Sequence, residues 1–168
     1  GVAGVTGGAS ANLSAINDAI DHQTGSDATL GNANDKDGAN TTAEVQAIVN
    51  AYNAILGEAN DTTNTAGDTT ADATPTVDPT AAQYALIGAS IGNAATDADN
   101  LALLNDIVGG LQTAQVDTIA KLNELATIAN AIQSVAATGT STPALNATHF
   151  AQAGLSGVTP DNLPAVLA

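Results

Sequence analysis

Three blocks of sequence recur in the same order along this chain, and this repetition restricts its fold more than any other feature. The first block occurs three times, the last time in shortened form, and the other two blocks occur twice. Their copies begin at Asn12, Asn100 and Asn162, at Thr41 and Thr118, and at Tyr84 and Phe150. Internal repetition at a period of tens of residues indicates one supersecondary unit that is used several times.

Apolar residues in the second block follow the spacing of an α-helix, in which positions three and four residues apart lie on one face. The two stripes consist of Val45, Ile48, Val49, Tyr52, Ile55 and Leu56, and of Ile119, Leu122, Leu125, Ile128, Ile132 and Val135. No segment shows the sustained alternation of apolar and polar residues that marks a half-buried strand. The sequence therefore predicts an all-α fold.

The order of the blocks predicts tandem three-helix repeat units, each with a short, a long and a short helix, that form a small bundle or a stacked array. The first unit covers residues 1–87 and the second covers 88–153. Residues 154–168 are the start of a third unit, which we expect to pack on a neighbour. Residues 60–77 are rich in Thr, Asp, Ala and Gly and lack an apolar stripe, so we expect a surface loop there.

The expected core is thin and aliphatic, because the chain has two Tyr, one Phe and no Trp. Small alanine side chains let helix backbones approach closely, while Leu and Ile fill the layer between them. We expect the long helices to bury Val45, Ile48, Tyr52, Ile55, Leu122, Leu125, Ile128 and Ile132. At the start of the third unit, we expect Leu163 and Val166 to contact the next unit.

The charge of the chain excludes several classes of partner. Its 17 acidic residues face only two basic ones, which gives a formal net charge of −15. Nucleic acids and anionic membrane surfaces both bind through clustered Lys and Arg, so neither is an expected partner. The sequence also lacks a run of apolar residues long enough for direct insertion into a membrane.

The residues that carry most enzyme chemistry are scarce. The chain has no Cys and two His, and it lacks a Gly-rich phosphate loop, a nucleophile elbow and the His spacing of a zinc enzyme. Pairs of acidic residues stand in polar turns rather than in apolar surroundings, where a carboxyl group would be tuned for acid or base catalysis. We therefore expect a protein that is not an enzyme.

One segment resembles the calcium loop of an EF-hand. With Gly38 at the sixth position of such a loop, Asp35 and Asp37 take the third and fifth positions and Glu44 takes the twelfth. The first position falls on Ala33, where that loop requires an Asp. A calcium site at Asp35, Asp37 and Glu44 is therefore one of two interpretations.

The other interpretation is a polar turn followed by the start of a helix. Thr41 and Glu44 have the spacing of a capping box. In this motif the side chain of each residue forms a hydrogen bond with the backbone N–H of the other. The matching region of the second unit has no comparable acidic cluster, which favours the capping box. Calcium stays the only cofactor that the sequence suggests.

The segments 42–56 and 154–163 resemble the helical tandem repeats of large secreted bacterial proteins, the RTX-type and biofilm-associated surface adhesins. The resemblance covers most of the chain outside residues 60–77, and it rests on composition and helical pattern. It implies a secreted or cell-surface location and calcium-rich surroundings. The implied partners are further copies of the chain or neighbouring repeats of the same chain, and no binding residue carries over.

Together these features predict a structural repeat of an extracellular bacterial protein. It would act as a self-assembling filament or surface-layer subunit, or as the stalk of an adhesin. One alternative is an adhesive binding module that recognises a surface or glycan through the Thr-rich loop at residues 62–76. A second alternative is a generic acidic domain that needs molar salt to fold.

Overall fold

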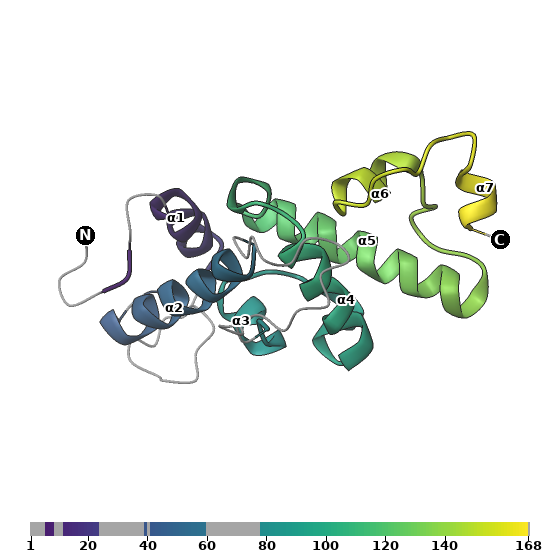
Figure 1. The fold of residues 1–168 in the computed structure, drawn as a ribbon. Helices are drawn as coiled ribbons and strands as arrows, with labels where there is room; N and C mark the ends of the chain where they lie inside the picture. Colours follow the sequence, from purple (N-terminus) through teal and green to yellow (C-terminus); the bar gives the residue numbers. More distant parts are fainter. Residues whose placement is uncertain (1–5, 9–11, 24–38, 40, 60–77, 168) are drawn as a thin grey trace.

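The computed structural model is helical, with its elements in the order shown in Figure 1. It describes residues 6–8, 12–23, 39, 41–59 and 78–167. No β-strand occurs in these residues, so the all-α prediction is confirmed for the part of the chain described. Asp35, Asp37 and the expected loop at 60–77 lie outside the described residues.

Seven α-helices and two short 3-10 helices form the described structure. The helices are α1 (Leu13–Asp21), α2 (Thr42–Glu58), α3 (Ala81–Leu86), α4 (Ala98–Gly109), α5 (Ile119–Thr138), α6 (Ala147–Gln152) and α7 (Leu163–Val166), with 3-10 helices η1 (Gly92–Ala95) and η2 (Thr113–Gln115). The long helices α2 and α5 begin one residue after Thr41 and Thr118, where the copies of the second block start.

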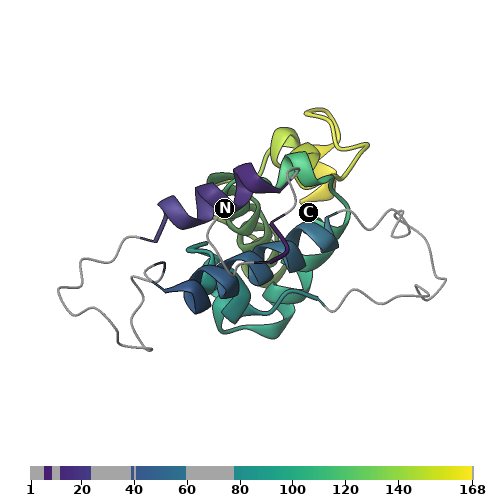
Figure 2. The same cartoon turned by 90° about the vertical axis from the view of Figure 1, so that its left-hand side faces the viewer.

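The helices follow one another along the molecule from its N-terminal to its C-terminal end. In Figure 1, α1 and α2 lie at the left, α4 and α5 in the middle, and α6 and α7 at the right. Figure 2 looks from the left-hand side of that view, so that α1 and α2 stand in front of α5. Each long helix packs against the short helix before it and the short helix after it.

The main hydrophobic core runs through α1 to α5 without interruption. It includes Ala15 and Ala19 of α1, Tyr84 of α3 and Leu104 of α4. From the two long helices the buried residues that we expected are Val45, Ile48, Tyr52, Ile55, Leu122, Leu125 and Ile128, whereas Ile132 is half-buried. The expected units 1–87 and 88–153 therefore share one core rather than forming two separate ones.

An acidic residue of α1 holds the start of α5. Asp18 Oδ2 accepts a hydrogen bond from the backbone N–H of Ile119 at 2.6 Å. The first N–H groups of a helix have no partner within the helix, and a carboxylate there also interacts favourably with the helix dipole. Asp18 thereby links the first short helix to the second long helix, 101 residues further along the chain.

Asp18→Ala is expected to lower the free energy of unfolding by about 1 kcal/mol, because one N–H at the start of α5 loses its acceptor. Urea unfolding followed by circular dichroism measures the change. The matched control is Asp106→Ala, which alters the exposed residue at the corresponding position of α4 and is expected to cost less than about 0.5 kcal/mol. Equal losses in the two variants would contradict this role for Asp18.

Candidate functional site

Two side-chain amides on α2 hold the segment that precedes α1. Gln46 Oε1 accepts from the backbone N–H of Thr6 at 2.7 Å, and Gln46 Nε2 donates to the Thr6 carbonyl at 2.9 Å. Asn53 Nδ2 donates to the carbonyl of the next residue, Gly7, at 2.9 Å. Residues seven positions apart on a helix lie on one face, two turns from each other. We call such a pair of amide residues on a long helix an amide clamp.

The helix α5 carries a second amide clamp with the same spacing. Asn123 Oδ1 accepts from the backbone N–H of Ser90 at 2.7 Å, and Asn130 Nδ2 donates to the carbonyl of Ile91 at 3.2 Å. In both clamps the first amide binds an N–H group and the second binds the carbonyl of the following residue. The two clamps thus hold equivalent backbone groups ahead of α1 and α4.

A glycine in a left-handed backbone conformation stands at each clamp. Gly7 has φ +84°, and a Cβ placed there would lie 3.2 Å from Asn53 Nδ2. Gly92 has φ +58°, and a Cβ placed there would collide with Asn130 Nδ2. The backbone conformation and the close approach of the asparagine both require glycine at Gly92.

Gly92→Ala is expected to lower the free energy of unfolding by about 2–3 kcal/mol, because alanine adds left-handed strain and displaces Asn130. Gly139→Ala is the matched control. Gly139 has φ +76° but open space around its Cβ position, so its substitution is expected to cost only about 1 kcal/mol. Thermal and urea unfolding of the two variants measure the difference. An equal loss would show that the Cβ added at position 92 does not clash with Asn130.

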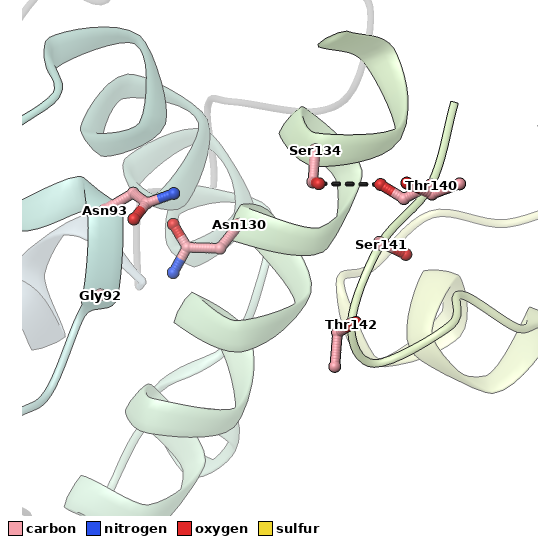
Figure 3. Close-up of a pocket in the computed structure, with 7 residues that line it drawn as sticks. All are labelled: Gly92, Asn93, Asn130, Ser134, Thr140, Ser141 and Thr142. Atoms are coloured by element: carbon pink, nitrogen blue, oxygen red, sulfur yellow. Dashed lines mark hydrogen bonds between the residues drawn. The ribbon is translucent and has the colours of Figure 1, made fainter. Parts of the chain in front are cut away.

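A polar pocket of about 420 Å³ opens beside the second clamp (Figure 3). Its lining has hydroxyl and amide groups and no ionisable side chain, and consists of Gly92, Asn93, Asn130, Ser134, Thr140, Ser141 and Thr142. Asn130 Oδ1 is buried and has no hydrogen-bond partner among the described residues. In the first clamp the corresponding oxygen, Asn53 Oδ1, accepts from Asn12 Nδ2 at 3.0 Å.

The junction between α3 and α4 is closed by buried hydrogen bonds. The Tyr84 hydroxyl donates to Asn105 Oδ1 at 3.0 Å, and Asn105 Nδ2 donates to the Pro79 carbonyl at 2.9 Å. Tyr84 is fully buried and Asn105 nearly so. Because each polar group has a partner, this junction avoids the cost of burying an unsatisfied donor or acceptor.

The junction between α6 and α7 is built at corresponding positions from apolar side chains. Phe150 takes the place of Tyr84, Leu145 that of Pro79, and Leu167 that of Asn105 when the repeated blocks are aligned. Phe150 and Leu145 form a buried cluster with Ala131, and Leu163 and Leu167 pack against that cluster. Apolar side chains therefore pack together at the second junction, where the first junction has a hydrogen-bonded pair.

Burial raises the pKa of both tyrosine hydroxyls above their ordinary value. For Tyr52 the loss of solvent is the largest cause, followed by the negative charges of Asp18 and Asp117, and its hydroxyl donates to the Val116 carbonyl at 3.0 Å. For Tyr84 burial is again the largest cause, followed by Glu58 and Asp78.

The raised pKa values predict that stability falls in alkaline solution. An unfolded tyrosine releases its proton near pH 10, whereas the folded Tyr52 and Tyr84 retain theirs, so the unfolded state binds fewer protons above that pH. Stability is therefore unaffected by these groups below about pH 10 and decreases as the pH rises further. Urea midpoints between about pH 8 and pH 11 measure the slope. Tyr52→Phe is expected to flatten it, and an unchanged slope would contradict this origin.

Of the three residues predicted for a calcium site, only Glu44 lies in the described part of the chain. Glu44 forms the capping box: its Oε2 accepts from the Thr41 N–H at 2.8 Å, and its own N–H donates to Thr41 Oγ1 at 3.2 Å. Asp35 and Asp37 lie outside the described residues. Within residues 6–8, 12–23, 39, 41–59 and 78–167, no group of three His, Cys, Asp or Glu side chains is placed to hold a metal ion.

The residues expected to contact a next unit differ in their surroundings. Leu163 is half-buried and packs against the α5 and α6 cluster of its own chain, because α7 folds back onto Phe150 and its neighbours. Leu163 therefore contacts helices that precede it in its own chain, and its contact with a next unit stays a prediction. Val166, on the same short helix, is 48% exposed and stays available to a neighbour.

Comparisons of the chain with protein-family models, curated proteins and solved structures give no match. Among the described helices, none has the length and apolar character needed to cross a membrane.

Proposed function

We propose that this chain is a structural repeat of an extracellular bacterial protein, a self-assembling filament or surface-layer subunit or the stalk of an adhesin. Its tandem units are α1 to α3 and α4 to α6, and α7 begins a third. Its partners are neighbouring units of the same kind, in the same chain or in further copies. The proposed role is mechanical and needs neither catalysis nor a resident cofactor.

The observation that carries this proposal is the pair of amide clamps. Two long helices bind equivalent backbone groups through amides at the same spacing, although the two contacts are made by different parts of the chain. A unit that is used repeatedly in an array must form the same contact each time, because each unit meets only its neighbours. The backbone turns that end α3 and α6 also repeat, since Ala89 N–H donates to the Tyr84 carbonyl and Leu155 N–H donates to the Phe150 carbonyl.

The charge supports an extracellular setting for such an array. At a net charge of −15 neighbouring copies repel one another in dilute salt, and this repulsion is screened at higher ionic strength. Light scattering at increasing chain concentration, with and without salt and calcium, is expected to show association that grows with ionic strength. A chain that stays monomeric under all these conditions would contradict the proposal of a self-assembling subunit, whereas the proposal of an adhesin stalk would still stand.

Immunogold electron microscopy tests the proposed role as a whole. Antibodies raised against this chain are expected to label filaments, layers or stalks on the surface of intact producing cells. The matched control is the same antibody after absorption with the purified chain, which is expected to abolish the label. Label found only in sectioned cytoplasm would overturn the proposal.

A second candidate function is an adhesive module that binds a glycan. The Thr-rich loop at 62–76 lies outside the described residues, but the pocket beside Asn130 favours this candidate. Its neutral hydroxyl and amide lining matches the hydroxyl groups of a sugar, and Asn130 Oδ1 is a buried acceptor without a partner among the described residues. Sugar titrations should then shift the NMR signals of Asn130 and Ser134, and unchanged signals would remove the candidate.

A further inference from the structure

A third copy of the clamped segment follows α6. The chain leaves α3 and α6 through the same turn, in which Ala89 N–H donates to the Tyr84 carbonyl at 2.9 Å and Leu155 N–H to the Phe150 carbonyl at 2.8 Å. This turn is the Schellman motif that ends many helices. Ser156 therefore stands in the position of Ser90, whose N–H is bound by the clamp on α5.

In this third copy the backbone groups that a clamp would bind have no long helix packed against them. The Ser156 N–H has no hydrogen-bond partner among the described residues, and Leu155 is 47% exposed. Gly157 has φ +87°, as Gly7 has +84°, but nothing lies within 4 Å of its Cβ position. At Gly7, the corresponding residue of the first clamp, the amide of Asn53 on the long helix α2 lies 3.2 Å from that position.

One apolar residue near the C-terminal end of α7, Val166, is exposed to solvent. When the repeated blocks are aligned, Val166 corresponds to Leu104 of α4. Leu104 is fully buried in the core that α4 shares with α5, whereas Val166 is 48% exposed. The element missing from the surroundings of Val166 is the one that covers Leu104, a long helix.

We propose that residues 155–157 and α7 form a docking surface for the long helix of a following unit. This inference rests on the proposed function. The partner helix carries two side-chain amides seven residues apart, with aliphatic residues on the same face. Its first amide accepts from the Ser156 N–H, and its second donates to the Gly157 carbonyl, which already accepts from Asn162 Nδ2 and has a second lone pair free.

The charge of the chain favours a partner helix that resembles α5 over one that resembles α2. Between residues 154 and 167 the only ionisable side chain is Asp161. The helix α5 carries one Lys and one Glu, so its side chains are balanced, whereas α2 carries two Glu and no basic residue. A balanced helix approaches the acidic chain without added repulsion, and docking then depends on the two amides and the aliphatic residues.

An extension of the chain tests the inference. Residue 167 is joined to an added copy of residues 106–153, so that α7 continues in the same register as α4 does. The added copy supplies a second α5, and NMR follows amide hydrogen exchange of Ser156 in the extended and the original chain. We expect exchange of this amide to slow roughly tenfold or more, because its N–H gains an acceptor and is shielded from water.

The matched control has Asn123→Ala and Asn130→Ala in the added copy only. It is expected to add the same helical content but to leave the Ser156 amide exchanging within about twofold of its rate in the original chain. An added long helix that forms without slowing Ser156 would overturn the docking surface and leave the tandem function standing. An added copy that stays unfolded would overturn both. Slowing of Ser156 in the original chain as its concentration rises would instead identify a second copy as the occupant and overturn the assignment.

Discussion

Tyr52→Ala is expected to lower the free energy of unfolding by about 3–5 kcal/mol, the largest loss from any single substitution considered for this chain. The side chain is fully buried in α2 and packs in the core shared by α1 to α5. Its removal leaves a cavity in a core that has few large side chains to fill it. It also removes the hydrogen bond to the Val116 carbonyl, so the first long helix loses a direct contact with the start of the second.

Tyr52→Phe separates the two contributions, since it keeps the ring and removes only the hydroxyl. Its expected cost is about 1–2 kcal/mol, the penalty for a buried carbonyl that loses its donor. Leu86→Ala serves as the exposed control, because Leu86 is 44% exposed, and is expected to cost about 0.5 kcal/mol. Urea unfolding by circular dichroism gives all three values. A loss below that of Leu86→Ala would show that Tyr52 is not packed as described.

Leu104→Ala is expected to cost about 2–5 kcal/mol, because Leu104 is fully buried between α4 and the long helices. The equivalent substitution in the third copy, Val166→Ala, is expected to change stability by less than about 0.5 kcal/mol. The expected costs differ because Leu104 is fully buried, whereas Val166 is 48% exposed.

The extended chain described above provides the control for this pair. Once an added long helix covers Val166, Val166→Ala is expected to cost about 1–2 kcal/mol, a value that approaches the cost of burying a valine. A cost that stays near zero in a folded extended chain would show that the added helix does not reach α7.

The long helices can be predicted from the sequence because the residues that indicate them lie close together along the chain. Val45, Ile48 and Tyr52 in α2 repeat at helical spacing, and Thr41 with Glu44 marks where the helix begins. Such signals depend on residues a few positions apart, so they can be recognised without knowledge of the rest of the fold. The same holds for the short helices that end at a glycine after Tyr84 and Phe150.

The amide clamps were not predicted, because they depend on contacts between distant parts of the chain. Thr6 and Gln46 are 40 residues apart, and nothing near Thr6 in the sequence indicates a partner. A signal was present in the aligned blocks, where Gln46 and Asn53 fall on Asn123 and Asn130. Amides that recur at the same two positions beside the apolar stripes of both long helices indicate that the two helices make the same contact.

The degree of burial of Leu163 and Ile132 does not follow from the sequence, for a different reason. Periodicity shows which face of a helix is apolar but not how many neighbours cover it. Near its C-terminal end α5 is covered only in part, so Ile132 stays half-buried, and α7 folds back so that Leu163 meets its own chain. The packing partner, and not the pattern, decides the burial of such residues.

Small-angle X-ray scattering of chains with increasing numbers of units tests the tandem arrangement most directly. The series contains the chain itself and chains extended in register by one and by two further copies. We expect the longest dimension to grow by the same increment with each copy while the cross-section stays constant, because each unit contacts only its neighbours. A particle whose cross-section grows instead, or added copies that scatter as unfolded chain, would contradict it.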